Sequence, residues 1–468
     1  MQKSWWRSGF LHSGAQMGEP LRSKRGVFSS LWAVDCRGGE SNSKGQDDRR
    51  SLRQAQGRLF DSRYAHRRMT ILLMGSQGIP QDGDAWRRCV RRVRGSSGGG
   101  GHLTDMNDGG VVEGLRLSVL DQSPVPAGST PGEALENSIA LARLVDGLGY
   151  RRFWMSEHHA MDTLACTAPE VMLARIGAET KRIRIGSGGI MLPHYTALKV
   201  AECFRMLHAL YPGRVDLGIG RAPGGGPVEA LALKRDRKTR MLDDFPEQVS
   251  ELLAFLGHNF PAGHPFAGIR VSPEMPGGPD VWMLGSSMWS AAAAVEFGLP
   301  YSFAHFFSPV HTRAAIETYR RGFTASAYRN RAEATVAVGV ICVETEEEAE
   351  YLASSVRLLQ RRIRQGDRRP VAAPEDAVRE LRLMGEMPME EGEWPRYFVG
   401  MPSLVREQLE GMASELGIGE LIVNTIVWDH AKRLRSYELL AEVFGLGQTR
   451  EGGLVEAGVA AQGAYPRG

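Results

Sequence analysis

The chain has 468 residues, of which 42% are hydrophobic, and its formal net charge is +3. This composition can supply a large apolar core, and no apolar run reaches the roughly 18–20 residues that a membrane-spanning helix needs. The charge is uneven, because residues 1–105 carry 19 Lys and Arg against 9 Asp and Glu, which leaves the remainder mildly acidic. The sequence therefore argues against a membrane protein and against a basic groove for nucleic acid.

The five cysteines are scattered along the chain and form no C-x-x-C pair: Cys36, Cys89, Cys166, Cys203 and Cys342. This usage is typical of reduced thiols. The N-terminus also lacks the uninterrupted apolar core of a signal peptide. We therefore expect a cytoplasmic protein.

Residues 1–112 form a segment rich in Arg, Gly and Ser, without hydrophobic periodicity. Such a segment cannot bury enough apolar surface to offset the entropy of ordering it. It is a disordered basic arm, an organelle transit peptide, or non-native sequence upstream of a true start at Met106. We favour the last interpretation and expect no function from this segment. Residues 447–468, rich in Gly and Ala, are expected to be a flexible tail.

Strands alternate with helices from about residue 113 to residue 446. The first strand is expected at 115–120. A helix follows, with Thr130 as its N-cap and Pro131 at its first position. The remaining strands are expected at 153–156, 183–192, 214–220, 281–285, 300–305, 335–343 and 420–427. The intervening helices are expected at 168–180, 198–210, 240–256, 287–297, 309–327, 345–363, 402–416 and 431–444. Residues 257–280 and 364–400 are expected to be insertions without such elements. Eight strands in this alternation predict an α/β fold, a (β/α)8 TIM barrel with insertions.

In such a barrel the chemistry lies at the carboxyl ends of the strands. The second strand is followed by Ser156, Glu157, His158 and His159. The spacing does not suit a metal site, because neighbouring strand residues point to opposite faces and no H-E-x-x-H helix is present. An acid–base or hydrogen-bonding role is the better interpretation, and a pair of structural histidines is the alternative. We expect no bound metal.

The third strand ends in a glycine-rich stretch that includes Gly188 and Gly189. Glycines at this position allow a flat ligand to approach the backbone, although a β-bulge would also explain them. The fourth strand carries Val215, Leu217 and Ile219 on one face, and Asp216 and small residues on the other. We expect this second face to line the barrel interior.

Arg221 follows the fourth strand, at the predicted rim of the barrel, where a guanidinium can bind a phosphate in a bidentate manner. A surface cation is the alternative. The fifth strand is followed by Ser286 and Ser287, with Ser290 in the first turn of the next helix. Hydroxyl groups and free N–H groups at a helix N-terminus form an anion site, although an ordinary helix cap would also use serine. Both features follow consecutive strands, so they can reach a single phosphate.

The ordered motifs resemble those of the bacterial-luciferase-like monooxygenases over roughly 330 residues. These motifs are S-V-L-D-Q-S-P at 118–124, S-E-H-H at 156–159, G-S-G-G-I-M-L-P at 186–193, G-R-V-D-L-G-I-G-R-A-P-G at 213–224, L-G-S-S at 284–287 and I-V-N-T at 422–425. The resemblance implies a barrel that binds FMN, which is often delivered in reduced form by a separate flavin reductase. Molecular oxygen would then form a C4a-peroxyflavin that oxidises a small organic substrate.

Carried over by position, His158 matches the active-site histidine of the family, and Glu157 is expected beside the cofactor. Gly188 and Gly189 match a non-prolyl cis peptide next to the flavin ring. The phosphate end is matched by Arg221, Ser286, Ser287 and Ser290. The family also implies a homodimer.

The sequence departs from the family at Gly225 and Gly226, where many relatives carry a Thr and an Asp, and the loop loses their side-chain hydrogen bonds. The basic run 234–238 beyond the loop is interpreted as a solvated helix face, with a phosphate-binding lid as the alternative. Three rival functions are an F420-dependent dehydrogenase on the same fold, a non-catalytic flavin-binding protein, and an unrelated phosphate-binding aldolase or isomerase. The His pair favours FMN over F420 only weakly.

Overall fold

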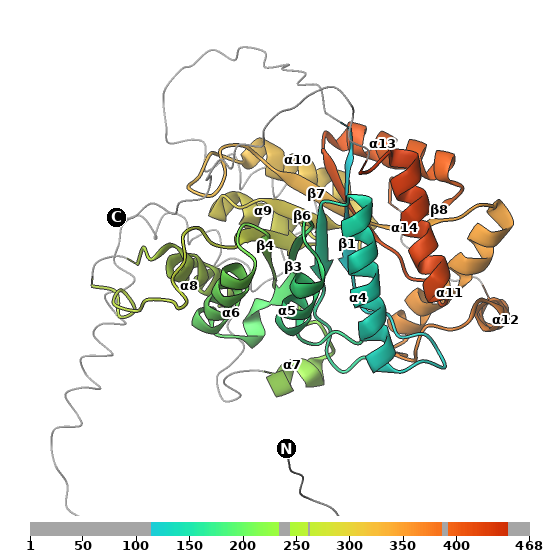
Figure 1. Ribbon diagram of the computed structural model, residues 1–468, viewed down its shortest axis with the longest axis horizontal. Helices are drawn as coiled ribbons and strands as arrows, with labels where there is room; N and C mark the ends of the chain where they lie inside the picture. Colours follow the sequence, from blue (N-terminus) through green and yellow to red (C-terminus); the bar gives the residue numbers. More distant parts are fainter. Residues whose placement is uncertain (1–113, 234–243, 261–262, 386–391, 448–468) are drawn as a thin grey trace, which may run out of the picture. The chain divides into compact units, whose positions relative to one another are not determined.

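The computed structural model describes residues 114–233, 244–260, 263–385 and 392–447 (Figure 1). The expected N-terminal extension, nearly all of the expected tail and the basic run at 234–238 lie outside these residues. All the elements below belong to one compact unit.

Nine parallel strands form the sheet, and eight of them close into a barrel. The strands are β1 (Arg116–Asp121), β2 (Arg152–Met155), β3 (Arg184–Met191), β4 (Val215–Gly220), β5 (Asp280–Gly285), β6 (Tyr301–Ala304), β7 (Ala334–Cys342), β8 (Tyr397–Gly400) and β9 (Glu420–Asn424). Strands β1 to β6 pair in chain order, β6 pairs with β7, and β9 lies between β7 and β1. The predicted TIM barrel is therefore confirmed.

Helices connect the strands and surround the barrel (Figure 1). They are α4 (Pro131–Leu148), α5 (Pro169–Glu179), α6 (Ala197–Leu210), α7 (Pro227–Leu233), α8 (Phe245–Gly257), α9 (Met288–Phe297), α10 (Thr312–Gly322), α11 (Glu346–Arg364), α12 (Pro374–Met384), α13 (Pro402–Leu416) and α14 (His430–Phe444). Short 3-10 turns lie at Leu192–His194 and Pro309–His311. The predicted start of α4 is confirmed, since Thr130 and Glu133 form a reciprocal capping box.

The alternation predicted for the fourth strand is also present in β4. Val215, Leu217 and Ile219 are buried in the large apolar core that the strands share with the helices. The opposite face points into the barrel, where a Cβ atom on Gly218 would lie 2.6 Å from Leu284 Cδ1. A smaller apolar cluster fills the barrel interior: Leu120, Trp154, Trp282, Ala337 and Ile422.

The structure differs from the sequence-based assignment mainly in the segment 364–400, which was expected to lack regular elements. It contains α12 and the four-residue strand β8. Strand β8 pairs with the last residues of β7, from Gly339 to Cys342, beyond the stretch of β7 that pairs with β6. Tertiary pairing with β7 stabilises a strand too short to show a periodic pattern. Helix α7, in the loop after β4, was also missed, and α10 ends at Gly322 rather than at 327.

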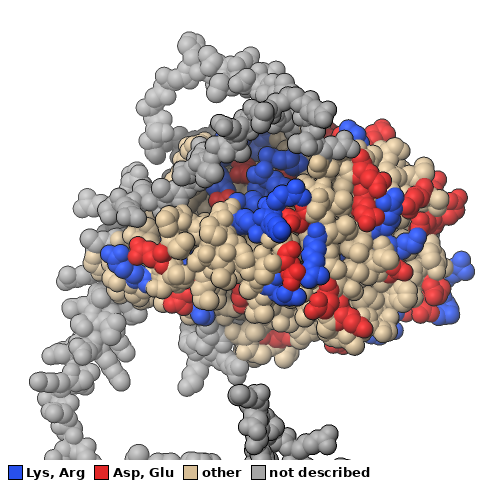
Figure 2. Space-filling model, in the orientation of Figure 1, with Lys and Arg blue, Asp and Glu red and all other residues tan. Residues whose placement is uncertain are grey.

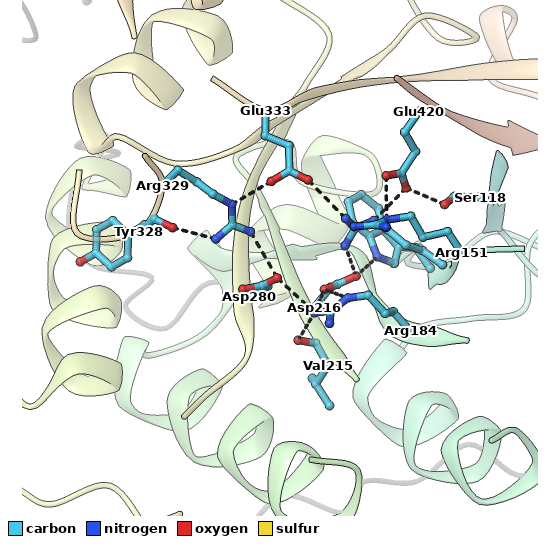
Figure 3. A network of polar contacts seen from close by, with 12 residues as sticks. Ser118, Arg151, Arg184, Val215, Asp216, Asp280, Tyr328, Arg329, Glu333 and Glu420 are labelled. Atoms are coloured by element: carbon cyan, nitrogen blue, oxygen red, sulfur yellow. Dashed lines mark hydrogen bonds and ion pairs between the residues drawn. The ribbon is translucent and has the colours of Figure 1, made fainter. Parts of the chain in front are cut away.

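The amino end of the barrel is closed by a buried network of ion pairs (Figure 3). At its centre, Arg152 donates to Asp216 Oδ2 at 2.9 Å and to Glu420 Oε1 at 2.8 Å. These three side chains are at most 2% exposed. Arg184 joins the network by pairing with both Asp216 and Asp280. Charges buried this deeply are tolerated only because each carboxylate meets several donors.

Arg329 and Glu333 extend this network from Asp280 toward the surface. Arg329 pairs with Asp280 at 3.2 Å and with Glu333 at 2.9 Å (Figure 3). Burial alone would raise the pKa of Asp216, but Arg184 and Arg152 outweigh it and lower this pKa to about 2. The carboxylate of Asp216 is therefore ionised at neutral pH.

Many charged side chains of the outer surface form exposed pairs, in contrast to the buried network. Basic and acidic side chains are interspersed over the face shown in Figure 2. Many of them form exposed pairs, such as Arg406 with Glu410 at 2.9 Å and Arg435 with Glu344 at 2.8 Å. Exposed pairs of this kind contribute little to stability.

Candidate active site

The predicted site residues all lie at the carboxyl end of the barrel. Each follows or ends a parallel strand: Glu157 and His158 after β2, Gly188 and Gly189 in β3, Arg221 after β4, and Ser286, Ser287 and Ser290 after β5. The carboxyl ends of parallel strands in a closed barrel share one rim, so these residues share one end of the molecule. The contacts between them show which ones the fold brings together.

The Gly188–Gly189 peptide bond is cis, as the family resemblance predicts. The alternative interpretation is also realised, because the register between β3 and β4 shifts between Gly188 and Ile190. A Cβ atom on Gly188 would lie 2.5 Å from Leu120 Cδ1, and one on Gly189 would lie 2.8 Å from the Gly218 oxygen. Packing inside the barrel therefore already excludes side chains at both positions.

Glu157 is fully buried, and its carboxylate binds groups of the protein. It accepts hydrogen bonds from the Met191 amide at 2.9 Å and from the Tyr195 hydroxyl at 2.9 Å, and it pairs with His159 Nε2 at 2.6 Å. The His159 amide in turn donates to the Gly224 carbonyl at 2.9 Å. Glu157 thus links the ends of β2, β3 and β4, and contact with a cofactor remains a prediction.

His158 is partly buried, and its ring has two polar neighbours. Its Nδ1 lies 3.2 Å from Ser156 Oγ, and its Nε2 lies 3.5 Å from Gln122 Nε2. Burial, aided by the neighbouring His159, lowers the pKa of His158 to about 4. The ring is therefore neutral at neutral pH, with one nitrogen able to accept a proton.

A chain of amide and hydroxyl groups continues from His158 across the barrel mouth. Asn424, at the end of β9, donates through Nδ2 to Gln122 Oε1 at 2.9 Å and to the Leu120 carbonyl at 3.3 Å. The Tyr397 hydroxyl donates to Asn424 Oδ1 at 3.4 Å. Gln122 and Asn424 belong to the motifs D-Q-S-P and I-V-N-T but were not predicted as site residues, and no sequence signal marked Tyr397, which begins β8.

Arg221 lies at the N-terminus of α9, in agreement with the predicted pairing of these two features. Its guanidinium carbon lies 4.3 Å from the centre of the Trp289 ring, in the first turn of that helix. Ser287 is the N-cap residue of α9, and Ser286 precedes it. An exposed guanidinium and the N–H groups at a helix N-terminus thus converge, which is the donor set that an anion such as a phosphate requires.

Ser290 lies behind this helix N-terminus rather than at its opening. Its hydroxyl is buried, lies 2.8 Å from the Tyr301 hydroxyl and donates to the Ser287 carbonyl at 2.7 Å. Donation to a phosphate would require the Ser290 hydroxyl to give up its hydrogen bond to the Ser287 carbonyl. The structure thus gives Ser290 a supporting position, while Ser286 and Ser287 are more accessible.

The loop after β4 is held in place despite its glycines. His194 Nε2 contacts the Pro223 carbonyl at 2.8 Å, and Glu229 on α7 pairs with Arg368 at 2.6 Å. Arg368 also donates to the Ala160 carbonyl at 2.9 Å. Main-chain contacts and one ion pair therefore replace the side-chain hydrogen bonds that the departures at 225 and 226 remove.

A cavity of about 480 Å³ lies between α11 and residues 392–399. Its lining combines aromatic groups with cationic ones, including Trp394, Tyr397, Arg357 and Arg361. It does not include His158 or Arg221, but Tyr397 belongs both to its wall and to the polar chain that ends at His158.

Two further properties concern only the part of the chain that the structure describes. No helix there is long and apolar enough to cross a bilayer. No group of three or more His, Cys, Asp or Glu side chains is arranged there to hold a metal ion.

A closed parallel barrel with polar groups at the carboxyl ends of its strands is the architecture of a large class of barrel enzymes. Within that class, the model of the luciferase-like monooxygenase family matches residues 115–419, and the chain belongs to this family. YceB of Bacillus subtilis (strain 168), described as uncharacterised, is 40% identical over 330 residues, which are 70% of this chain and 99% of YceB.

Two further similarities are informative. N-acetyl-S-alkylcysteine monooxygenase, also from Bacillus subtilis (strain 168), is 34% identical over 329 residues, covering 70% of this chain and 98% of that protein. Among solved structures, apo-MsnO8 is 46% identical with a TM-score of 0.66, covering 72% of this chain and 100% of that one.

Proposed function

We propose that this protein is a monooxygenase that uses reduced FMN and molecular oxygen to oxidise a small organic substrate at the carboxyl end of the barrel. The observation that carries the proposal is the convergence of Arg221, Trp289 and the N-terminus of α9 at the same barrel end as the neutral His158. Membership of the luciferase-like monooxygenase family supports the same reaction class.

The residues present fit a flavin mononucleotide. Its phosphate would be held by the Arg221 guanidinium, the hydroxyl groups of Ser286 and Ser287 and the first N–H groups of α9, with Ser290 supporting the helix cap from behind. Its ring would lie toward Gly188 and Gly189 and toward His158. Glu157 would contribute indirectly, because its carboxylate fixes the Met191 amide and the His159 ring at the rim.

Reduced flavin, when bound, supplies the electrons with which oxygen is activated. The protein supplies the surroundings. His158 presents an uncharged imidazole, whose free nitrogen can accept a proton or hold a polar atom of the reacting group. The loop after β4, held by Glu229 and Arg368, would limit the access of water to the bound flavin.

The name of one similar protein indicates which substrates to test first. The similar Bacillus subtilis protein is, by its name, a monooxygenase of N-acetyl-S-alkylcysteines. We therefore propose S-alkylated N-acetylcysteines as the first compounds to test, alongside simpler thioethers. A flavin reductase that delivers the reduced cofactor is a second proposed partner, as the family resemblance implies.

A homodimer is proposed from the outer surface of two neighbouring helices. Val171 on α5 and Met206 and Leu210 on α6 are 55–65% exposed. Helices α5 and α6 pack side by side (Figure 1), and burying their exposed apolar groups against a second copy is favourable. Analytical ultracentrifugation should give twice the mass of the chain, and replacing Met206 and Leu210 by Glu should give the monomer.

The experiment that tests the function is a titration of the full-length protein with reduced FMN and with reduced F420 without oxygen, followed by rapid mixing with oxygenated buffer. We expect tight binding of reduced FMN and oxygen-dependent conversion of a thioether substrate. Binding of F420 alone, with no oxygen consumption, would instead indicate a deazaflavin-dependent dehydrogenase. Binding of FMN with no turnover of any substrate would favour the non-catalytic flavin-binding alternative.

His158→Ala tests the proposed catalytic residue. We expect turnover to fall by about 10²–10⁴-fold, since general acid–base groups contribute this much, while FMN affinity changes little. The matched control is His311→Ala, which removes an exposed histidine at the 3-10 turn after β6. Turnover unchanged in His158→Ala would remove His158 from the mechanism.

A further inference from the structure

The hydrogen-bond partners of His158 determine which of its two ring nitrogens carries the proton. In a neutral imidazole one nitrogen donates and the other accepts, and the chemistry of the ring depends on which is which. Two main-chain carbonyl groups at the end of β1, those of Leu120 and Asp121, provide fixed references for this assignment. A backbone carbonyl can only accept a hydrogen bond.

The Leu120 carbonyl determines whether His158 Nε2 donates or accepts a hydrogen bond. Asn424 places its amide nitrogen 3.3 Å from the Leu120 carbonyl, because an amide oxygen there would face another oxygen. The same nitrogen donates to Gln122 Oε1 at 2.9 Å, so the oxygen of Gln122 faces Asn424. The amide nitrogen of Gln122 must then point the other way, toward His158 Nε2 at 3.5 Å. Since an amide nitrogen only donates, His158 Nε2 must accept.

The Asp121 carbonyl gives a consistent assignment for His158 Nδ1. Ser156 directs its hydroxyl toward the Asp121 carbonyl at 3.5 Å, and it can only donate there. Its oxygen remains free to accept from His158 Nδ1 at 3.2 Å. Both sides of the ring therefore assign the proton to Nδ1 and the lone pair to Nε2.

We propose that Gln122 and Ser156 are positioning residues that hold His158 as the Nδ1–H tautomer, with Asn424 fixing the orientation of Gln122. This inference deepens the proposed function by naming the nitrogen, Nε2, that takes up a proton during turnover. The contact between Gln122 and Nε2 is the longest in the chain from Asn424, at 3.5 Å, so it is the contact most easily exchanged for a reacting group.

The tautomer can be measured on the full-length protein without flavin. Two-bond ¹H–¹⁵N correlation spectra of ¹⁵N-histidine-labelled protein near pH 7.5 distinguish a protonated from an unprotonated ring nitrogen. The chain has 12 histidines, so the signal of His158 is identified as the one lost in His158→Ala. We expect the Nδ1–H form in roughly tenfold excess or more, because the other form leaves two buried contacts mismatched. An excess of the Nε2–H form would overturn the proposal.

Gln122→Glu reverses the polarity of the decisive contact. A carboxylate accepts from Asn424 as before, but it also accepts at the other oxygen, so the proton of His158 should move to Nε2 or a second proton should bind. Ser156→Ala removes the acceptor at Nδ1 and should reduce the excess of the Nδ1–H form severalfold. This second variant keeps the proposal testable if Gln122→Glu does not fold.

The matched control is Gln248→Glu, another buried glutamine, whose amide contacts the Tyr195 carbonyl. This variant introduces a similar buried carboxylate but leaves the hydrogen-bond partners of His158 unchanged. The NMR signal of His158 should therefore not change. If Gln122→Glu leaves the proton on Nδ1, or if the control shifts it equally, Gln122 does not set the tautomer.

The spectra are independent of cofactor and substrate, so the tautomer assignment can fail while the proposed function holds, and the reverse. Where turnover is detected, Gln122→Glu should also change the pH profile of kcat rather than only KM. A change in melting temperature alone, with an unchanged His158 signal, would show a purely structural role for Gln122.

Discussion

At the amino end of the barrel, charged side chains from several strands meet in the interior, whereas at the carboxyl end the side chains that contact the His158 ring, Gln122 and Ser156, carry no charge. Arg152, Asp216 and Glu420 form the buried ion network of one end. His158, Gln122 and Asn424 form the neutral chain of the other, with contacts as long as 3.5 Å. The first end has donors and acceptors in close mutual contact, and the second has an accepting nitrogen held only weakly.

The difference shows how one fold separates stability from chemistry. A densely paired network has one low-energy arrangement and tolerates no exchange of partners, so it suits the closed end of the barrel. A reacting group must exchange partners, and a neutral chain with long hydrogen bonds allows this at low cost. The comparison predicts that changes at the amino end affect folding, and changes at the carboxyl end affect binding and turnover.

The largest effect is expected from Arg152→Met at the amino end. Removing this guanidinium leaves the carboxylates of Asp216 and Glu420 buried without their common partner, which should lower the free energy of unfolding by about 3–5 kcal/mol. Urea denaturation followed by circular dichroism measures the loss. Arg406→Met, which breaks an exposed pair with Glu410, is the control and should cost at most about 1 kcal/mol. Equal losses would mean that the network is not a special source of stability.

Acid should weaken the same end. The pKa of Asp216 is about 2, below its value of about 3.8 in an unfolded chain, so its contribution is present above pH 4 and is lost as the pH falls toward 2. This lowering of the Asp216 pKa corresponds to a contribution of about 2 kcal/mol to the free energy of unfolding at neutral pH. The measurement is the difference in unfolding free energy between wild type and Asp216→Asn, which should shrink over this range. A difference independent of pH would show that folding does not shift the pKa of Asp216.

At the carboxyl end, Arg221→Ala should affect ligand binding and leave stability almost unchanged. We expect about 10–100-fold weaker binding of FMN, since a hydrogen bond to a charged group contributes about 1.5–3 kcal/mol. Riboflavin lacks the phosphate and is the matched ligand, whose affinity should change little. Fluorescence titration of both flavins measures the effect. An equal loss for both would mean that Arg221 does not contact the phosphate.

Glu229→Gln should have a smaller effect, confined to the loop after β4. The variant weakens the pair with Arg368, so the amides of α7 should exchange with solvent severalfold faster, while those of β4 keep their protection. Hydrogen exchange followed by mass spectrometry gives both values. If α7 is unaffected, the main-chain contacts of Pro223 and Gly224 are enough to hold the loop.

The smallest effect is expected from deleting residues 1–105. We propose that this segment is not part of the folded domain, because its sequence lacks the hydrophobic periodicity of the barrel. The melting temperature should stay within about 1 °C of that of the full chain. A large fall in the melting temperature would show that the segment contributes to the stability of the fold.

Much of the fold could be predicted from local sequence patterns. Alternating strands and helices from Leu115 to Phe444, with signals such as the Thr130 cap, were enough to predict the barrel and its carboxyl rim. Strand β8 and helix α12 were missed, since a four-residue strand has no period of its own and depends on β7 for its pairing. Their assignment requires knowledge of which distant segment lies alongside.

The same limit applies to the site. Arg221 and the serines near α9 could be paired in advance, because they follow consecutive strands. The partners of His158 could not, since Gln122 and Asn424 are 302 residues apart and their contact exists only after the barrel closes. The supporting position of Ser290 was also hidden, because it depends on the Tyr301 hydroxyl of the next strand. The position of a residue along the chain predicts at which end of the barrel it lies, but not which side chains it contacts.

Strand β7 pairs with β9 and also with both β6 and β8, and this has a consequence for engineering. Its first residues pair with β6, and its last residues pair with β8, which belongs to the insertion before α13. Trimming residues 365–400 to obtain a minimal barrel would leave Val340, Ile341 and Cys342 as an unpaired, apolar strand edge. Such an edge is a template for pairing with another chain, so the shortened protein should aggregate. The insertion thus protects the solubility of the domain, in addition to any part it has in catalysis.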